Sequence, residues 1–86
     1  MKRHLTDASV QRLKPPRDKD LEVFDLGYPG LALRVGYGGA KSFILFYRYA
    51  GKLRRETLGR WPETSLGAAR ERWRRAREAH RATTPP

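Results

Sequence analysis

Basic side chains, interleaved with aromatic and leucine side chains along the middle of the chain, are the residues best suited to chemistry here. Residues 34–62 hold seven Lys or Arg against one acid, Glu56. Guanidinium and ammonium groups bind phosphates, and arginine also binds guanine edges. The whole chain carries a formal net charge of +10, which indicates a polyanionic partner such as DNA, RNA or an anionic membrane.

Other kinds of chemistry find little support in the residue types. The chain has no cysteine, which excludes disulfides, zinc sites with thiolate ligands and thiol catalysis, and is typical of a reducing cytoplasm. His4 and His80 lie near opposite ends, so we expect no metal, no cofactor and no catalytic site. Tyr47 and Tyr49 have no phosphoryl-transfer site around them. No apolar run approaches the roughly 20 residues of a membrane span, so we expect no membrane partner.

A glycine-rich stretch, residues 36–40, precedes Lys41 and invites comparison with a phosphate-binding loop. That motif requires glycine directly before the lysine and a helix after it. Here Ala40 precedes Lys41, and a strand follows. We therefore interpret the stretch as a connection between strands, and keep Lys41 only as a candidate phosphate contact.

These side chains must be positioned by a single small domain, because 86 residues allow only one compact core. Thr6 is a helix cap, with Leu5 and Val10 spaced as a hydrophobic staple, and Pro15-Pro16 ends this short helix. Residues 14–22 are rich in charged residues and proline, and this composition predicts a loop. Phe24-Asp25 is at most a short extended piece.

Alternating and β-branched residues predict three strands over residues 31–35, 41–49 and 53–58. Ser65 then caps a helix that runs to about His80. Its apolar stripe is Leu66, Ala69, Trp73, Ala76 and His80. The other faces carry arginines that we expect to be solvated: Arg70, Arg72, Arg74, Arg75, Arg77 and Arg81.

The predicted fold is therefore α+β: a three-stranded antiparallel sheet, with the C-terminal helix packed on one face, and a short N-terminal helix. We expect the domain to cover residues 1–82, with 83–86 as a flexible tail or the start of a linker. One helix covers only one face of a sheet, which leaves the other face available for a partner.

Ala50-Gly51 predicts a two-residue hairpin turn, which sets the register of the two strands around it. The expected pairs are Tyr49 with Lys52, Arg48 with Leu53, Tyr47 with Arg54, Phe46 with Arg55, Leu45 with Glu56, Ile44 with Thr57 and Phe43 with Leu58. The face holding Phe43 and Leu45 is the more apolar and should meet the helix. The alternate residues should then be exposed.

The candidate DNA-contacting residues follow from this register and from the basic turns. They are Arg34, Lys41, Ile44, Phe46, Arg48, Lys52, Leu53, Arg55 and Thr57. Arginines suit guanine edges or phosphates, Thr57 and Ile44 suit thymine methyl groups, and Lys52 at the turn suits a phosphate. The alternative for Arg48 and Arg55 is a solvated strand surface. For Trp61 and Trp73 we expect a core role, with base stacking as the alternative.

The order of short motifs resembles one known family. Leu5-Thr6-Asp7, Lys14-Pro15, Phe24-Asp25, Pro29-Gly30-Leu31, Leu33-Arg34-Val35, Lys41-Ser42-Phe43, Tyr47-Arg48, Gly51-Lys52, Thr57-Leu58-Gly59, Ser65-Leu66 and Ala69-Arg70 resemble the N-terminal arm-site DNA-binding domain of prophage-type tyrosine recombinases. The resemblance covers nearly the whole chain. This chain departs from it at Phe46, where the family often has arginine.

The resemblance implies a sheet placed in the major groove of the outer arm sites of attachment DNA, in a phage integrase that performs site-specific integration. It also implies a catalytic domain further along the chain, other integrase protomers and DNA-bending accessory proteins as partners, and a bacterial cytoplasmic location on the nucleoid. Two other functions stay open from the residues alone. One is an RNA-binding domain, and the other is a protein-interaction domain that docks through Ile44, Phe46 and Leu53.

Overall fold

The computed structural model describes residues 2–15 and 17–83, with side chains as far as Ala79. Five strands and two helices follow one another along the chain: β1 (Lys2–Arg3), α1 (Asp7–Arg12), β2 (Leu21–Asp25), β3 (Leu31–Val35), β4 (Lys41–Tyr49), β5 (Lys52–Trp61) and α2 (Leu66–Thr83). α2 continues past His80, through Thr83, so the first residue of the tail expected at residues 83–86 is helical. The rest of that tail, residues 84–86, lies outside the described residues.

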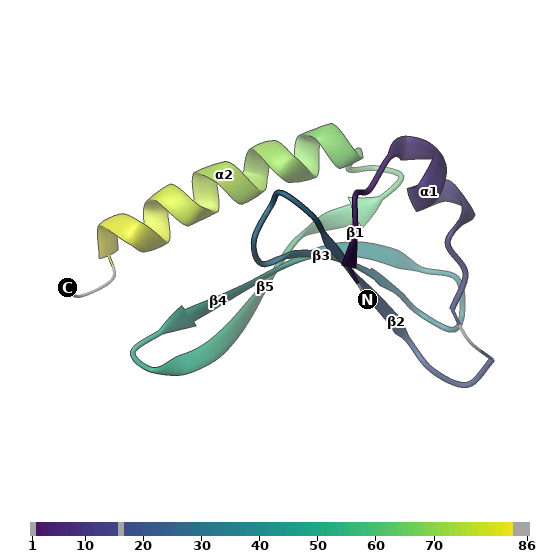
Figure 1. The fold of residues 1–86 in the computed structure, drawn as a ribbon, viewed down its shortest axis with the longest axis horizontal. Helices are drawn as coiled ribbons and strands as arrows, with labels where there is room; N and C mark the ends of the chain where they lie inside the picture. The colour runs from purple at the N-terminus through teal and green to yellow at the C-terminus, as the bar shows by residue number, and fades with distance from the viewer. Residues whose placement is uncertain (1, 16, 84–86) are drawn as a thin grey trace.

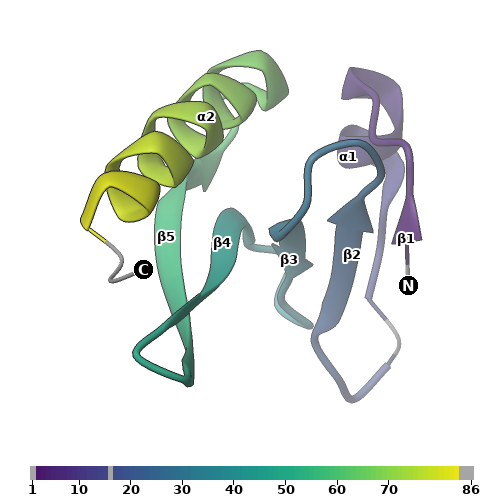
Figure 2. The ribbon, with the colours of Figure 1, turned by 60° about the vertical axis from the view of Figure 1, so that its left-hand side comes forward.

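The sheet has five strands in the order β1-β2-β3-β4-β5 (Figure 2), so the expectation of three strands is wrong. β2 begins at Leu21, within the segment predicted as a loop, and pairs antiparallel with β3. β1 is two residues long and parallel to β2. β1 is too short to give a sequence pattern, and charged residues at the start of β2 obscure its alternation. The predicted strands form the β3-β4-β5 part of the sheet.

Both helices of the described residues lie on one side of the sheet, and neither covers the other side (Figure 1). The core between them combines Leu5 and Val10 from the N-terminal segment with alternate residues of β2, β3 and β4. Leu66 and Ala69 of α2 complete it. The α+β class and the helix-covered face are therefore as predicted.

Local sequence signals explain where both helices begin. Thr6 caps α1: its hydroxyl oxygen accepts a hydrogen bond from the Ser9 amide at 3.1 Å, and the Ser9 hydroxyl oxygen accepts one from the Thr6 amide at 2.9 Å. This reciprocal pair satisfies two of the amides that a helix N-terminus leaves without partners. The Ser65 hydroxyl likewise accepts from the Ala68 amide at the start of α2.

The β4–β5 hairpin turns at Ala50-Gly51, whose φ angles are 52° and 77°. Two consecutive positive φ angles are the geometry of a type I′ turn, which matches the twist of the flanking strands. The predicted register is confirmed from Tyr49↔Lys52 to Ile44↔Thr57. It fails at Phe43, which pairs with Gly59 rather than Leu58, because a bulge inserts one residue into β5.

Candidate nucleic-acid interface

We call the sheet surface opposite the two helices the open face. By strand alternation, β4 and β5 contribute to it Ser42, Ile44, Phe46, Arg48, Leu53, Arg55, Thr57 and Arg60. Arg34 joins from β3, where it pairs with Ser42. Most of the predicted contact residues therefore lie on one continuous surface, with neighbouring strands about 4.8 Å apart.

Three arginines of the open face have no competing partner. The side chains of Arg48, Arg55 and Arg60 are exposed and make no hydrogen bond or ion pair with the residues that the structure describes. Their backbones are held by the β4–β5 ladder, opposite Leu53, Phe46 and Ser42. Their guanidinium groups can donate hydrogen bonds to phosphates or to guanine.

Arg60 was not among the predicted contacts. The bulge explains why: Leu58 and Gly59 together oppose Phe43, so the next residue is shifted by one position and Arg60 reaches the open face. Leu58 meanwhile packs against the core. A Cβ at Gly59 would collide with Thr64 and Arg72. The glycine after Thr57-Leu58 was the only sequence signal of this bulge.

The apolar members of the open face differ in accessibility. Ile44 is only 5% exposed, so its expected exposure is wrong. It lies on a central strand between Ala32 and Thr57. Phe46 is partly buried against the ring of Phe24, at 5.4 Å between centroids. Leu53 is 63% exposed. The docking patch considered from sequence is therefore smaller than expected, and exposed Thr57 is better placed than Ile44 for a thymine methyl group.

Lys41 lies on the opposite, helix-covered face. Its ammonium donates to the carbonyl oxygens of Val10 and Gln11, at 2.7 and 2.8 Å, and lies 5.0 Å from the Trp61 ring centroid. Burial lowers the pKa of Lys41, and the nearby charge of Lys14 adds to the effect. Helix C-termini leave carbonyls without intrahelical partners, so Lys41 caps α1 from a distant strand.

Lys41→Met is accordingly expected to lower the free energy of unfolding by about 1–3 kcal/mol, because two carbonyls lose a charged donor. The salt dependence of DNA binding should not change. Urea unfolding and binding titrations over a salt range measure the two quantities. Lys14→Met, which removes an exposed charge nearby, is the control and should keep parental stability. A Lys41 variant of parental stability with a shallower salt slope would make Lys41 a phosphate contact after all.

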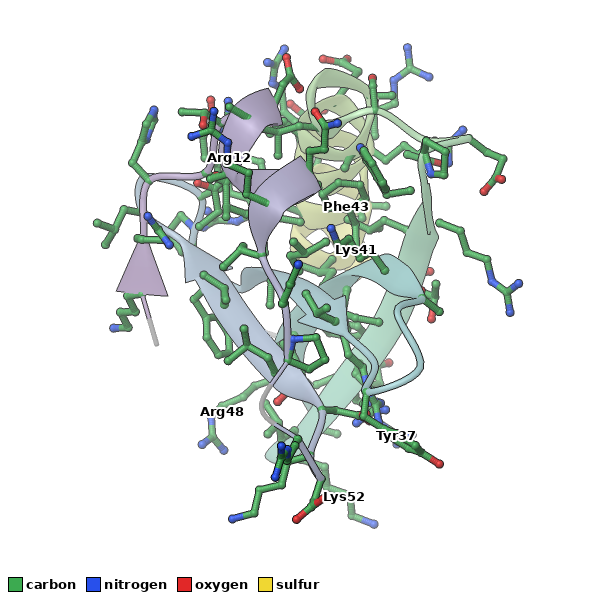
Figure 3. All side chains as sticks on the ribbon, turned by 90° about the vertical axis from the view of Figure 1, so that its right-hand side faces the viewer. Arg12, Tyr37, Lys41, Phe43, Arg48 and Lys52 are labelled. Carbon is green, nitrogen blue, oxygen red and sulfur yellow. The ribbon has the colours of Figure 1, made fainter. Side chains whose placement is uncertain are left out.

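The end of the hairpin is exposed and basic. Lys52 lies at the turn beside Gly51, and Figure 3 shows Arg48 and Lys52 at the end of the molecule away from α1 and Lys41. Strand alternation assigns Lys52 to the same side as Tyr49, not to the open face. The hairpin bends away from α2 towards its tip (Figure 1), and Ala50, Gly51 and Lys52 at the turn are exposed.

The arginines of α2 are less uniform than the expected solvated row. Arg70 donates through Nε to the Asp25 carboxylate at 2.9 Å, and Arg72 donates to the Leu58 carbonyl at 2.8 Å. Both side chains therefore connect α2 to the sheet. Arg74 and Arg75 are exposed, and Glu71 is the only acid that pairs with them among the described residues.

Trp73 packs against the core, as expected, rather than offering its ring for base stacking. Its indole Nε1 donates to the Pro29 carbonyl at 2.8 Å, and Tyr28 meets its ring edge-on at 5.1 Å. Arg77 lies over the same ring, 5.0 Å from the centroid. Trp61 also packs against the core.

Among residues 2–15 and 17–83, no group of three or more His, Cys, Asp or Glu side chains is arranged to hold a metal ion. No helix there has the length and apolar composition needed to cross a membrane.

The chain was also compared with known proteins. A family model described as an arm DNA-binding domain matches residues 5–85. A search of the curated proteins found no match.

Proposed function

Since the chain belongs to the arm DNA-binding domain family, a non-catalytic N-terminal module of phage integrases, we propose that its open face recognises specific sequences in duplex DNA. The β3-β4-β5 part of the sheet would enter the major groove of arm-type attachment sites. The chain then serves an integrase that performs site-specific integration and whose catalytic domain is a tyrosine recombinase.

The observation that carries this proposal is the set of unpaired arginines on a sheet face with no helix over it. Arg48, Arg55 and Arg60 project from a hydrogen-bonded ladder, which fixes their spacing. A two-stranded ribbon fits the major groove, where each base pair presents a distinct pattern of donors and acceptors. Lys52 at the turn would reach the phosphate backbone. Other integrase protomers, DNA-bending proteins and a place on nucleoid DNA in the bacterial cytoplasm belong to the same proposal.

Binding to duplex DNA is expected to weaken steeply with salt. If about five phosphates are neutralised, the logarithm of the association constant should fall with the logarithm of salt concentration at a slope near −4.5. Fluorescence anisotropy with a labelled duplex at several salt concentrations measures the slope. An affinity that is flat from low to moderate salt would contradict an interface built from arginines and phosphates.

A competition experiment with unlabelled nucleic acids, together with sedimentation, distinguishes duplex-DNA binding from RNA binding and from protein interaction. Unlabelled duplex DNA should displace the probe more effectively than duplex RNA, whose deep and narrow major groove excludes a sheet. Sedimentation should show a monomer without DNA. Stronger displacement by RNA would favour an RNA-binding domain, and self-association through Leu53 without DNA would favour a protein-interaction surface.

A further inference from the structure

One acidic side chain, Asp20, joins three segments at the edge of the open face. Its Oδ2 accepts hydrogen bonds from Arg34 Nε at 3.2 Å and from Arg34 Nη2 at 2.6 Å. Its Oδ1 accepts from the Tyr37 backbone amide at 3.2 Å. Asp20 lies directly before β2, Arg34 lies in β3, and Tyr37 lies in the β3–β4 loop. One carboxylate therefore holds both an arginine and a loop.

The contacts leave part of the guanidinium available. Arginine has five N–H donors in a planar fork, and Asp20 accepts through Nε and Nη2, so the Nη1 group can still donate. Arg34 pairs across the sheet with Ser42, whose other neighbour is Arg60. Tyr37 beside it is 73% exposed, and its side chain projects outward in Figure 3.

Stability does not account well for this arrangement. The two side chains are 36% and 32% exposed, and ion pairs this exposed contribute little to the free energy of unfolding. The pair has a larger effect on binding, through the orientation of Arg34. An arginine that is already held in one conformation loses less conformational entropy when it binds DNA. The hydrogen bonds from Arg34, and secondly from Tyr37, lower the pKa of Asp20, so the carboxylate stays charged at neutral pH.

We propose that Asp20 is a positioning residue that sets the base specificity of Arg34. The proposal rests on the proposed DNA-binding function. Asp20 fixes the direction in which the free side of the Arg34 guanidinium meets a base edge, and its negative charge repels phosphates. Both effects increase specificity. The carboxylate favours binding to a DNA sequence whose bases suit the held arginine, and it disfavours contacts with the phosphate backbone of any other sequence.

The test is selection of binding sites from a randomised duplex library. Five proteins are compared: the parent, Asp20→Asn, Asp18→Asn, Arg34→Ala and the double variant Asp20→Asn with Arg34→Ala. Asp18 is the matched control, because it lies exposed in the same loop and contacts neither Arg34 nor the Tyr37 amide among the described residues. Asp18→Asn removes the same charge and leaves the contacts of Asp20 with Arg34 and the Tyr37 amide in place.

We expect Arg34→Ala and Asp20→Asn to lose the base preference at the same position of the selected site and to keep the others. The loss should be about fivefold or more, the lower range for one bidentate arginine–base contact. Asp18→Asn should select the parental site. The double variant should show no loss beyond that of Arg34→Ala, because Asp20 acts through Arg34.

Other outcomes overturn the proposal. If Asp20→Asn and Asp18→Asn raise affinity for every duplex equally, Asp20 is only a repulsive charge. If Asp20→Asn weakens all positions together, its effect is structural, and unfolding midpoints of the variants will show this. These results differ from a failure of the proposed function, in which the parental protein itself would enrich no sequence from the library.

Discussion

Replacement of Arg70 by alanine is expected to lower the free energy of unfolding by about 3–5 kcal/mol, the usual result of removing one partner from a buried ion pair. The Asp25 side chain is fully buried, and Arg70 bonds both of its oxygens, at 2.9 and 3.3 Å. Arg70 also donates to the Leu5 carbonyl at 2.8 Å. Without Arg70, the buried carboxylate keeps, among the described residues, only the Leu5 amide as a donor.

The matched control is Arg74→Ala on the same helix. Arg74 pairs with Glu71 at 3.2 Å, but the side chains are 62% and 45% exposed. Exposed pairs of this kind contribute about 0–1 kcal/mol. Urea unfolding of the parent and the two variants measures the difference in the free energy of unfolding. It is calculated from the transition midpoints, provided that the dependence of this free energy on urea concentration is unchanged. Equal losses for the two variants would show that the Asp25–Arg70 contact does not hold α2 to the sheet.

Arg48→Ala and Arg55→Ala are each expected to weaken binding to a selected cognate duplex by about 1–3 kcal/mol, and to affect a scrambled duplex much less. The reason is that the β4–β5 ladder fixes both backbones on the open face, opposite Leu53 and Phe46. Exposed strand positions seldom affect folding by more than about 0.5 kcal/mol. The loss should therefore come from the complex.

Arg74→Ala and Arg75→Ala are the controls for this experiment. Both arginines lie on α2, on the far side of the sheet from the open face, and both are exposed. Removing either one should change cognate and scrambled binding equally, if at all. Titrations of every variant against both duplexes at one salt concentration make the comparison. A selective loss for the α2 variants, with equal losses for the strand variants, would make α2 the element that recognises the sequence.

The Asp25–Arg70 contact also shows why the number of strands was underestimated. Leu21–Asp25 has alternating apolar residues, but Lys19, Asp20 and Glu22 surround its start, and the last inward position is an aspartate. A buried acid is unfavourable unless it is paired. Its partner lies 45 residues away on α2. Only the assembled fold therefore accounts for Asp25 as an inward-facing residue of a strand.

Sequence alone determined the features that depend on neighbours a few residues apart. The Thr6 and Ser65 caps, the Ala50-Gly51 turn and the register that it imposes on Arg48 and Arg55 all follow from local backbone geometry. Strand alternation then separates the basic face from the apolar face, since side chains point to opposite sides with a period of two. The charge of the central stretch required no structure either.

Tertiary structure alone decided which cations are available to a partner. Lys41 donates to a carbonyl of α1, 30 residues away. Arg34 pairs with Asp20, 14 residues away, and Arg70 pairs with Asp25. The bulge opposite Phe43 brings Arg60 to the open face. A local pattern contains no information about such contacts, because their partners are selected by how distant strands and helices pack together. The sequence therefore determined where the basic surface lies, and the packing decided which of its arginines remain unpaired.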